Sequence, residues 1–384
     1  MKPELLHAIH RPVAAGPKLR VGVIGTGGMG RAHVAAYQQH PRAEVVAIAD
    51  PDAGHLHSCG DSFGVERRYA SATELFAGET LDVVSVVTPN AFHKPITLQA
   101  LAAGCHVLCE KPMAMNTAEA RQMVAAAERA GRRLMINFSY RFHPAARAAR
   151  NQVEAGVLGD IYYARSVWHR RRGIPRLGGW FTTKALSGGG PLIDLGVHRL
   201  DLALWLMGHP RPVWAVGSAH DVIGTGIARR AGRTFDVEDI AVGFVKFDNG
   251  ATLSLEASWA ANIGEPELME TRLLGDLGGL VQRNVNGGYD FEAEIHTERA
   301  GCPLDTRLHP PVAAVEPSSM AHFVDAILND TPHMAPGEEG VVVMQVLDAI
   351  YKSAREGVPV RIRNGHDAPR TAAARPEPVL AEAH

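Results

Sequence analysis

A short apolar segment, Leu19–Ile24, runs directly into the glycine-rich sequence Gly25-Thr-Gly-Gly-Met-Gly30. This order most constrains the fold, because glycines at this spacing join a strand to a helix in a βαβ unit. The first glycine allows a tight turn, the second a close approach to a pyrophosphate, and the third close packing of helix on strand. A helical pattern follows from about residue 29 and ends before Pro41. The segment therefore predicts a parallel sheet that binds a dinucleotide.

The rest of the first half repeats this alternation of strands and helices. The predicted strands are 19–24, 44–49, 81–87, 106–109 and 134–138, and the later predicted helices are 93–103 and 117–130. The strand at 81–87 is almost wholly apolar, as expected for a strand buried on both faces. Strands that alternate with helices at this spacing indicate an α/β Rossmann domain.

The second half has a different pattern, typical of an α+β domain with an antiparallel sheet. Residues 161–168 alternate, and residues 239–247 and 251–259 flank an Asp-Asn-Gly turn that predicts a hairpin. Residues 269–274 and 279–283 predict another strand pair, and 338–355 a helix. We predict a mobile leader (1–18), a dinucleotide-binding domain (19–140), an α+β substrate and oligomerisation domain (141–335), a helix and strand that could pack back on the first domain (336–362), and a mobile tail (363–384).

Composition excludes several classes of function. The formal net charge is −2 without a long basic block, so no nucleic-acid partner is expected. No apolar run reaches about 18 residues, so no membrane span is expected. The cysteines, Cys59, Cys105, Cys109 and Cys302, form no C-x-x-C pair. We therefore expect no metal site, and reduced thiols in the cytoplasm.

Asp50 ends the second strand, 20 residues after Gly30. A carboxylate there accepts hydrogen bonds from ribose hydroxyls and repels a 2′-phosphate, which favours NAD over NADP. Thr88-Pro89-Asn90 ends the third strand, where ligands of an open parallel sheet bind. His93 is either a nicotinamide contact or a partly exposed histidine at a helix start. The predicted cofactor-binding residues are Gly25, Thr26, Gly27, Gly28, Met29, Gly30, Asp50, Thr88, Pro89, Asn90, His93, Glu110 and Lys111.

Candidate reacting groups come from two distant stretches. Lys111, in Glu110-Lys-Pro112, follows the fourth strand, and Asp194, His198 and Asp201 share one face of a predicted, largely buried helix. Buried carboxylates are costly unless they are paired or used, so the alternative is a satisfied Asp–His pair in the core. Histidine suits proton transfer near neutral pH, and an ammonium stabilises a developing alkoxide. The aspartate would orient the imidazole or hold a neighbouring hydroxyl.

Together these motifs resemble the Gfo/Idh/MocA family, over about residues 19–362. The resemblance rests on the glycine-rich loop, Thr88-Pro-Asn90, His93, Glu110-Lys-Pro112 and Asp194-Leu-Gly-Val-His198, in this order. It implies a Rossmann domain followed by an α+β domain with a large, mostly antiparallel, open-faced sheet. It also implies a catalytic group of Lys111, Asp194 and His198, with His198 as the favoured acid or base.

The resemblance further implies an NAD-dependent dehydrogenase or reductase that acts on a ring hydroxyl or ketone of a sugar, sugar derivative or cyclic polyol such as an inositol. The expected substrate-binding residues are Lys111, Tyr140, Arg141, Arg172, Trp180, Lys184, Asp194 and His198. The run of arginines that holds Arg172 is more typical of a solvated loop, whereas an Arg172 facing the crevice would favour an anionic sugar.

Family members often pair their open sheets, so a homodimer or homotetramer is expected. The hairpin at 239–259, with Val242, Phe244, Leu253 and Leu255, could supply that surface, or one of its faces could pack on the protein's own helices. Two other functions stay open: an NAD-dependent glycosidase that acts through transient oxidation, and a non-catalytic regulator that binds NAD or a sugar.

Overall fold

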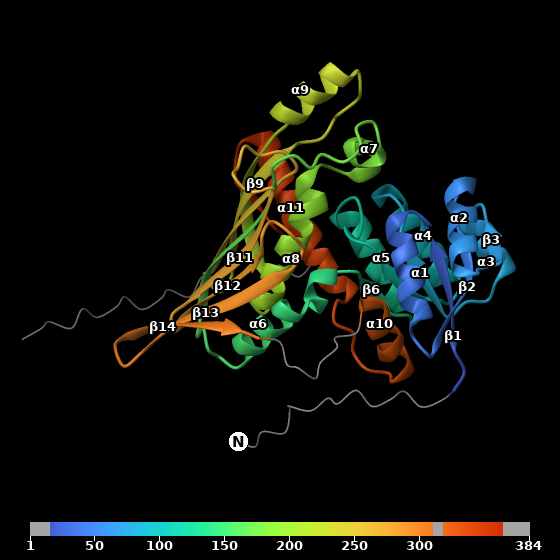
Figure 1. Cartoon of the computed structure of the whole chain (residues 1–384), viewed down its shortest axis with the longest axis horizontal. Helices are drawn as coiled ribbons and strands as arrows, with labels where there is room; N and C mark the ends of the chain where they lie inside the picture. Colours follow the sequence, from blue (N-terminus) through green and yellow to red (C-terminus); the bar gives the residue numbers. More distant parts are fainter. Residues whose placement is uncertain (1–15, 310–317, 364–384) are drawn as a thin grey trace, which may run out of the picture.

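The computed structural model describes residues 16–309 and 318–363, which form two sheets side by side (Figure 1). The predicted leader and tail lie outside these residues, apart from 16–18 and 363. The first sheet is parallel, with strand order β3-β2-β1-β4-β5-β6. Its strands are β1 (Leu19–Ile24), β2 (Ala43–Ala49), β3 (Arg67–Tyr69), β4 (Val83–Val86), β5 (His106–Cys109) and β6 (Leu134–Ile136).

This strand order is that of a doubly wound dinucleotide-binding sheet, as predicted. The helices among its strands are α1 (Gly28–Gln38), α2 (Ala53–Phe63), α3 (Ala72–Gly78), η1 (Asn90–Phe92), α4 (His93–Ala102) and α5 (Thr117–Ala130). All four residues of β4 are buried, as expected for a central strand. The sequence analysis missed β3 because this three-residue edge strand is Arg-Arg-Tyr and has no apolar run.

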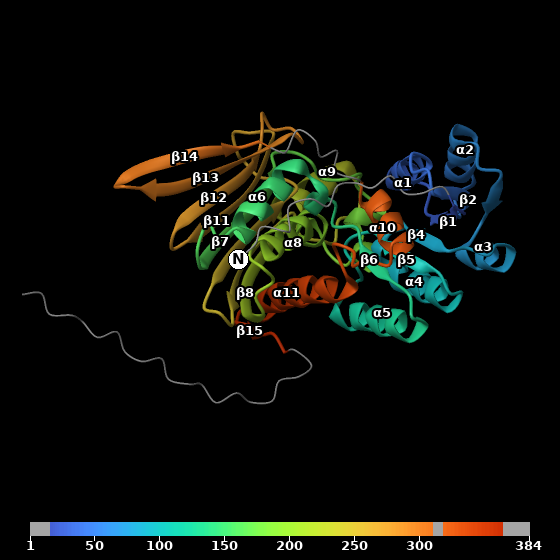
Figure 2. The same ribbon diagram turned by 90° about the horizontal axis from the view of Figure 1, so that it is seen from below.

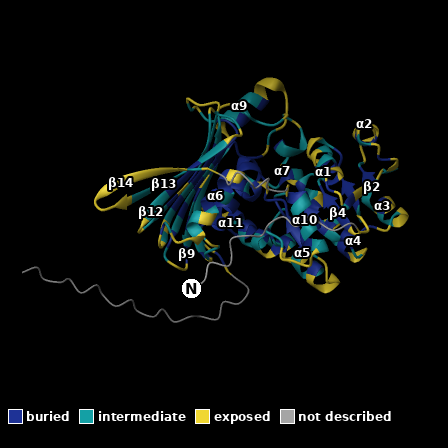
Figure 3. Ribbon diagram, turned by 60° about the horizontal axis from the view of Figure 1, so that its bottom comes forward, coloured by how far each residue is buried: buried dark blue, intermediate teal, exposed yellow. Residues whose placement is uncertain are grey.

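The second sheet is large and mostly antiparallel, as predicted. Its order is β14-β13-β12-β11-β7-β10-β9-β8-β15, and only the β7–β10 pair is parallel within the described residues. The strands are β7 (Ile161–Arg170), β8 (Pro212–His220), β9 (Ile240–Phe247), β10 (Thr252–Ser258), β11 (Glu267–Gly275), β12 (Gly278–Asn284), β13 (Phe291–Arg299), β14 (Cys302–Leu308) and β15 (Val360–Arg361). The edge strand β14 is almost wholly exposed (Figure 3).

Helices α6 (Pro144–Glu154), α8 (Val197–Leu206) and α11 (Gly337–Glu356) cover one face of this sheet, whereas α10 (Ser319–Leu328) packs against α1 of the first domain (Figure 2). The remaining helical segments are η2 (Ser139–Phe142), η3 (Trp180–Thr182), α7 (Lys184–Ser187), η4 (Leu192–Gly196) and α9 (Val222–Ala231). In the β9–β10 hairpin, Leu253 and Leu255 are fully buried, whereas Val242 is 38% exposed. The cross-strand register places Val242 and Phe244 on the opposite face from the two leucines.

Two features tie the sheets together. Helix α11 packs between β8 of the second sheet and α5 of the first (Figure 2). The fully buried Arg141, from η2, donates hydrogen bonds to both carboxylate oxygens of Asp201 on α8 (3.0 and 2.5 Å), to Glu339 on α11 and to the Met334 backbone oxygen. Burial raises the pKa of Asp201 to about 6, although Arg141 acts to lower it.

Among the described helices, none combines the length and the apolar character that crossing a membrane requires.

We predict that Arg141→Met lowers the free energy of unfolding by about 3–5 kcal/mol, because it leaves the Asp201 carboxylate buried without its partner. The urea midpoint measures the loss. The control is the double variant Arg141→Met/Asp201→Leu, which removes both charges and should lose less than the single variant. An unchanged midpoint in Arg141→Met would show that the pair does not hold the two sheets together.

Candidate active site

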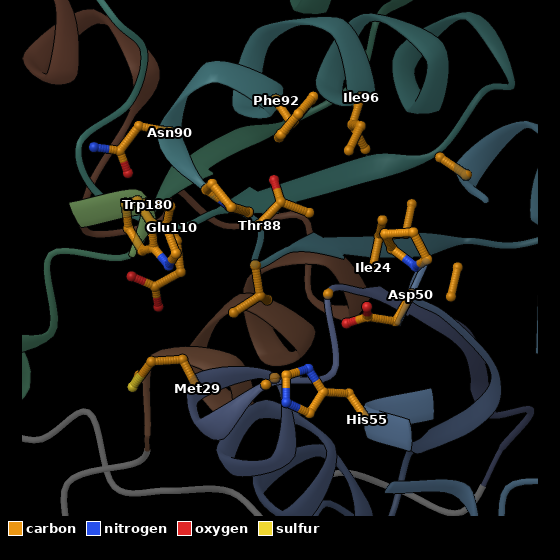
Figure 4. Close-up of a pocket in the computed structure, with 18 of the residues that line it drawn as sticks. Ile24, Met29, Asp50, His55, Thr88, Asn90, Phe92, Ile96, Glu110 and Trp180 are labelled. Atoms are coloured by element: carbon orange, nitrogen blue, oxygen red, sulfur yellow. The ribbon is translucent and has the colours of Figure 1, made fainter. Parts of the chain in front are cut away.

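A cavity of ≈ 740 Å³ lies where strands β1, β2, β4 and β5 end. Asp50 and His55 stand at one end of it, and Glu110 and Trp180 at the other (Figure 4). This is the edge of a parallel sheet at which dinucleotides bind. The cavity is also lined by Lys111 and Asp194, so the two sheets share it.

The glycine-rich loop forms one wall of the cavity. Gly25 has a φ of +93°, and a Cβ atom on Gly30 would lie 1.9 Å from the Gly25 carbonyl oxygen. Both glycines are therefore required by the protein itself. A Cβ atom on Gly27 or Gly28 would meet no protein atom within 4 Å, although both line the cavity. The open space above these two glycines and the adjoining start of α1 fit a bound pyrophosphate.

Asp50 lies at the end of β2 and faces the cavity. Its Oδ2 accepts hydrogen bonds from the Thr26 backbone N–H (2.7 Å) and hydroxyl (3.1 Å), and its Oδ1 accepts one from the Asp52 N–H (2.9 Å). The glycine-rich loop thus orients the carboxylate, which retains acceptor capacity for ribose hydroxyls.

The loop after β4 contributes Thr88, Pro89 and Asn90 to the lining. The Asn90 side chain donates to the Ser187 backbone oxygen (2.7 Å) and so joins this loop to α7. His93 is fully buried, with one ring nitrogen 2.7 Å from the Pro112 oxygen and the other 2.8 Å from the Thr88 oxygen. Because each ring nitrogen contacts a backbone oxygen, His93 links the loops after β4 and β5. Its ring does not line the cavity, so it is not in contact with the space for the cofactor.

Glu110 lines the cavity from the end of β5 and belongs to a buried network. Its Oε1 accepts from Asn137 (2.5 Å) and lies 2.9 Å from the His33 ring nitrogen. Burial acts to raise the pKa of Glu110, but the hydrogen bonds from His33 and Asn137 and the charge of Lys111 bring it below its ordinary value. The carboxylate therefore stays charged beside Lys111.

Lys111 and Asp194 come together as predicted. The Lys111 ammonium donates to Asp194 Oδ1 and to the Asp194 backbone oxygen, both at 2.9 Å. Asp194 Oδ2 accepts a hydrogen bond from the Trp259 indole (3.0 Å). Residues of both domains thus hold the Asp194 carboxylate. Among the described residues it has no hydrogen bond to His198, so the structure does not support the expectation that Asp194 orients the imidazole.

His198 lies one turn beyond Asp194, 9% exposed and packed against Tyr140 (ring centroids 5.0 Å apart) and Trp168 (5.7 Å). Burial lowers the pKa of His198 well below its ordinary value, and the charges of Lys111, Arg199 and Arg170 lower it further. The imidazole is neutral at physiological pH. Its Nδ1 is buried without a partner among the described residues. The cavity is lined by Asp194 but not by His198.

Asp201 does not join Asp194 at the cavity, although helical spacing predicted one shared face. Residues Leu192–Gly196 form a π-helix that carries Asp194, and His198 and Asp201 both lie on α8, which follows it. Asp201 instead binds Arg141 in the core. A π turn cannot be read from hydrophobic periodicity, because the spacing of apolar residues in this buried helix is nearly continuous.

The predicted substrate-side residues divide into two groups. Tyr140 packs against His198, and Trp180 lines the cavity with Phe181 stacked on it (3.7 Å). The other three do not reach the site. Arg141 is bound by Asp201 and Glu339, Arg172 is exposed and donates to Asn262 (2.8 Å), and Lys184 is exposed at the start of α7.

Sequence reasoning gave no role to Trp259, although its indole holds Asp194. The only signal was its position at the end of a predicted strand. His55, Phe92 and Ile96 also line the cavity without any motif that marks them. The described residues contain no group of three or more His, Cys, Asp or Glu side chains placed to hold a metal ion.

A Rossmann sheet with an open pyrophosphate cradle and an ammonium–carboxylate pair at its edge defines a nicotinamide-dependent oxidoreductase. Residues 19–138 match the "Oxidoreductase family, NAD-binding Rossmann fold", and residues 146–281 match the "GFO/IDH/MocA C-terminal domain". The chain belongs to the GFO/IDH/MocA oxidoreductase family, as its sequence motifs indicated, and its cofactor is NAD.

Known relatives share the whole architecture. D-glucoside 3-dehydrogenase of Escherichia coli K12 is 36% identical over 358 residues, which cover 90% of this chain and 97% of the relative. The crystal structure of aldose-aldose oxidoreductase from Caulobacter crescentus, complexed with glycerol, is 28% identical with a TM-score of 0.75 and covers 90% of this chain and 99% of that one. GenD2 from gentamicin A biosynthesis, solved with NAD, is 28% identical with a TM-score of 0.76 and covers 93% and 100%.

The glycine geometry predicts that two neighbouring substitutions affect different properties, one the NAD affinity and the other the thermal stability. Gly27→Ala adds a methyl group only to the cofactor space, so we expect at least about a tenfold weaker NAD affinity, or 1.4 kcal/mol, with an unchanged melting temperature. Gly30→Ala drives its methyl group into the loop backbone and should lower the melting temperature. Calorimetric titration measures the NAD affinity, and thermal melting measures the stability. Full NAD affinity in a folded Gly27→Ala variant would contradict a pyrophosphate site at this loop.

The position of Asp50 predicts cofactor choice. Asp50→Asn keeps an acceptor for Thr26 but removes the negative charge, so the ratio of NAD to NADP affinity should fall at least about tenfold. The control is Asp52→Asn, because asparagine also caps α2 and Asp52 is not part of the cavity. Equal cofactor ratios in Asp50→Asn and the parent protein would contradict the ribose role of Asp50.

Proposed function

We propose that this enzyme oxidises a ring hydroxyl of a sugar, sugar derivative or cyclic polyol, or reduces the corresponding ketone, with NAD as cofactor. The observation that carries the proposal is the 2.9 Å contact between the Lys111 ammonium and Asp194 at the end of the dinucleotide cavity. Both reacting-group candidates on the second sheet, Asp194 and His198, lie on the segment that this contact holds.

The chemistry divides between the cofactor and the side chains. Bound NAD supplies the acceptor for the hydrogen and electron pair that leave the hydroxyl-bearing carbon. Lys111 donates a hydrogen bond to the reacting oxygen and stabilises its developing negative charge. His198 accepts the hydroxyl proton at Nε2, since its low pKa leaves the imidazole neutral. Asp194 holds the Lys111 ammonium in position, and Trp259 holds Asp194 in place.

The substrate class is supported by the relatives and by the shape of the site. D-glucoside 3-dehydrogenase and aldose-aldose oxidoreductase carry sugar names, and both cover 90% of this chain. The aromatic rings of Tyr140 and Trp180 border the site, and aromatic faces are common in sugar pockets. We therefore propose a hexopyranose or its glycoside as the first substrate to test, with absorbance at 340 nm as the assay.

We also propose a cytoplasmic homodimer or homotetramer formed through the second sheet. All four cysteines are free, which suits a reducing compartment. The helix-free face carries Val242, 38% exposed, beside the half-buried Phe244. Such apolar residues on an uncovered sheet face suit pairing with a second copy.

Lys111→Ala and His198→Ala should each lower kcat by at least about a hundredfold, the usual range for proton-transfer residues, while NAD affinity stays nearly intact. The control is Lys94→Ala, which removes a lysine that pairs with Glu119 and does not line the cavity. Steady-state turnover and NAD titration measure both effects. Near-normal turnover in either site variant would show that the substituted residue is not required for the reaction. Glycoside cleavage without net NADH formation would indicate a glycosidase.

A further inference from the structure

A run of three glycines at residues 188–190 precedes the π-helix η4 and has no role in the steps proposed for the reaction. A Cβ atom on Gly190 would lie 2.1 Å from the Glu238 backbone oxygen, and one on Gly189 would lie 2.1 Å from the Tyr351 hydroxyl oxygen. Glu238 lies just before β9, and Tyr351 lies on α11. Two of the glycines therefore let residues from distant parts of the chain reach the start of this helix.

The Glu238 carboxylate binds the free N–H groups at the start of the helix. Its Oε2 accepts a hydrogen bond from the Gly190 N–H (2.9 Å), and its Oε1 accepts one from the Leu192 N–H (3.2 Å). Pro191, the residue before η4, has no N–H and provides no cap. A carboxylate that is only 9% exposed thus replaces a local cap, and the positive end of the helix stabilises its charge.

Tyr351 holds the Glu238 carboxylate in this position. Its hydroxyl donates a hydrogen bond to Glu238 Oε1 (2.7 Å). Burial and the charge of Glu238 raise the pKa of this hydroxyl well above its ordinary value, so the hydroxyl remains a donor. Helix α11 therefore fixes the carboxylate that in turn fixes the start of η4.

The peptide of Gly190 connects Glu238 with the reacting groups. Its N–H binds Glu238, and its carbonyl oxygen accepts a hydrogen bond from the Asp194 N–H (3.1 Å). The Asp194 carbonyl oxygen accepts one from the Lys111 ammonium (2.9 Å). Lys111 therefore binds the backbone of a segment that Glu238 holds, in addition to the Asp194 side chain.

Helix α11 also holds the Lys111 side of the contact. Asp348 lies one helical turn before Tyr351 on α11. Its Oδ2 accepts hydrogen bonds from the N–H (2.8 Å) and the hydroxyl (2.6 Å) of Thr117, the first residue of α5. The loop that carries Lys111 leads into α5, so one helix supports both of the segments that meet at the Lys111–Asp194 contact.

We propose that Glu238, clamped by Tyr351, is a positioning residue that holds Asp194 at hydrogen-bond distance from the Lys111 ammonium. The inference rests on the proposed dehydrogenase function, in which Lys111 stabilises the reacting oxygen. Neither Glu238 nor Tyr351 lines the cavity, so both act through the segment that they hold. Their loss should leave NAD affinity unchanged and slow hydride transfer, because a small displacement of a reacting group is costly.

The test uses two conservative variants. Tyr351→Phe removes the hydroxyl and keeps the ring, and Glu238→Gln replaces one acceptor by an amide donor that opposes a backbone N–H. With methyl β-D-glucoside as the probe, the single-turnover rate constant of NADH formation should fall at least about tenfold in each variant, while NAD affinity is unchanged. The amplitude reports the folded fraction, so a loss of stability alone would lower the amplitude and leave the rate constant unchanged.

The matched control is Tyr69→Phe. It removes a hydroxyl–carboxylate hydrogen bond of the same kind, from Tyr69 to Glu79 (2.9 Å), and neither residue lines the cavity. This variant should keep the parent rate constant and NAD affinity.

Two further measurements need no substrate. In Glu238→Gln, hydrogen exchange of the amides in residues 190–194, measured by mass spectrometry, should be at least about tenfold faster than in the parent. Acetic anhydride should modify Lys111 faster in both variants, because Asp194 then holds its ammonium less firmly. Lys94, which pairs with Glu119 outside the cavity, is the internal reference.

The outcomes separate the positioning role from the activity on which it rests. If the parent does not oxidise methyl β-D-glucoside, the proposed activity on glucosides fails, and the exchange and Lys111 modification still decide the positioning role. Unchanged exchange in Glu238→Gln would overturn that role. Faster exchange with the parent rate constant and parent Lys111 reactivity would also overturn it, because Glu238 would then only cap the helix.

Discussion

The site depends on one contact, between the Lys111 ammonium and Asp194, because these residues belong to different sheets. Lys111 follows β5 at the edge of the parallel sheet, and Asp194 lies on the π-helix that packs against the second sheet. Neither sheet alone holds the groups needed for oxidation of an alcohol. The ties between the sheets, helix α11 and the buried Arg141, are therefore part of the site although they touch no reacting group. A shift of about an ångström between the sheets would separate the ammonium from the carboxylate.

The segment that carries Asp194, His198 and Asp201 begins as a π-helix at Leu192–Gly196 and continues as α8. Asp194 lies at the cavity, whereas Asp201 lies in the core, where it binds Arg141. One buried carboxylate thus serves the site and the other stabilises the fold. Asp194 and Asp201 cannot be distinguished by residue type, and their different roles follow from the different partners that they bind.

Much of the fold follows from local sequence. The glycine loop, the apolar strands and the Asp-Asn-Gly turn predicted both sheets, because each is a local pattern that favours one backbone conformation. The sequence analysis missed strands β3 and β14 because they are short or solvent-facing and lack an apolar run. It also missed β8 and β13, although β13 alternates apolar and polar residues at its start. At the site, Lys111, Asp194 and the glycine loop lie together as predicted, since motif residues sit at strand and helix ends. Trp259 and Arg141 could not be assigned in this way, because their roles depend on a partner more than 50 residues distant.

The charges around His198 explain why the site needs both a lysine and a histidine. Lys111, Arg170 and Arg199 surround an imidazole that is almost fully buried, and all three charges disfavour its protonation. Such an imidazole is a weak base, so it cannot alone remove a proton from a sugar hydroxyl. Lys111 resolves this difficulty, because its ammonium lowers the cost of the negative charge that forms on the same oxygen. Asp194 then limits the net positive charge at the cavity end while Trp259 fixes its direction. The pairing of a weak base with an ammonium thus places the stabilisation of the developing alkoxide at the Lys111–Asp194 contact that joins the two sheets.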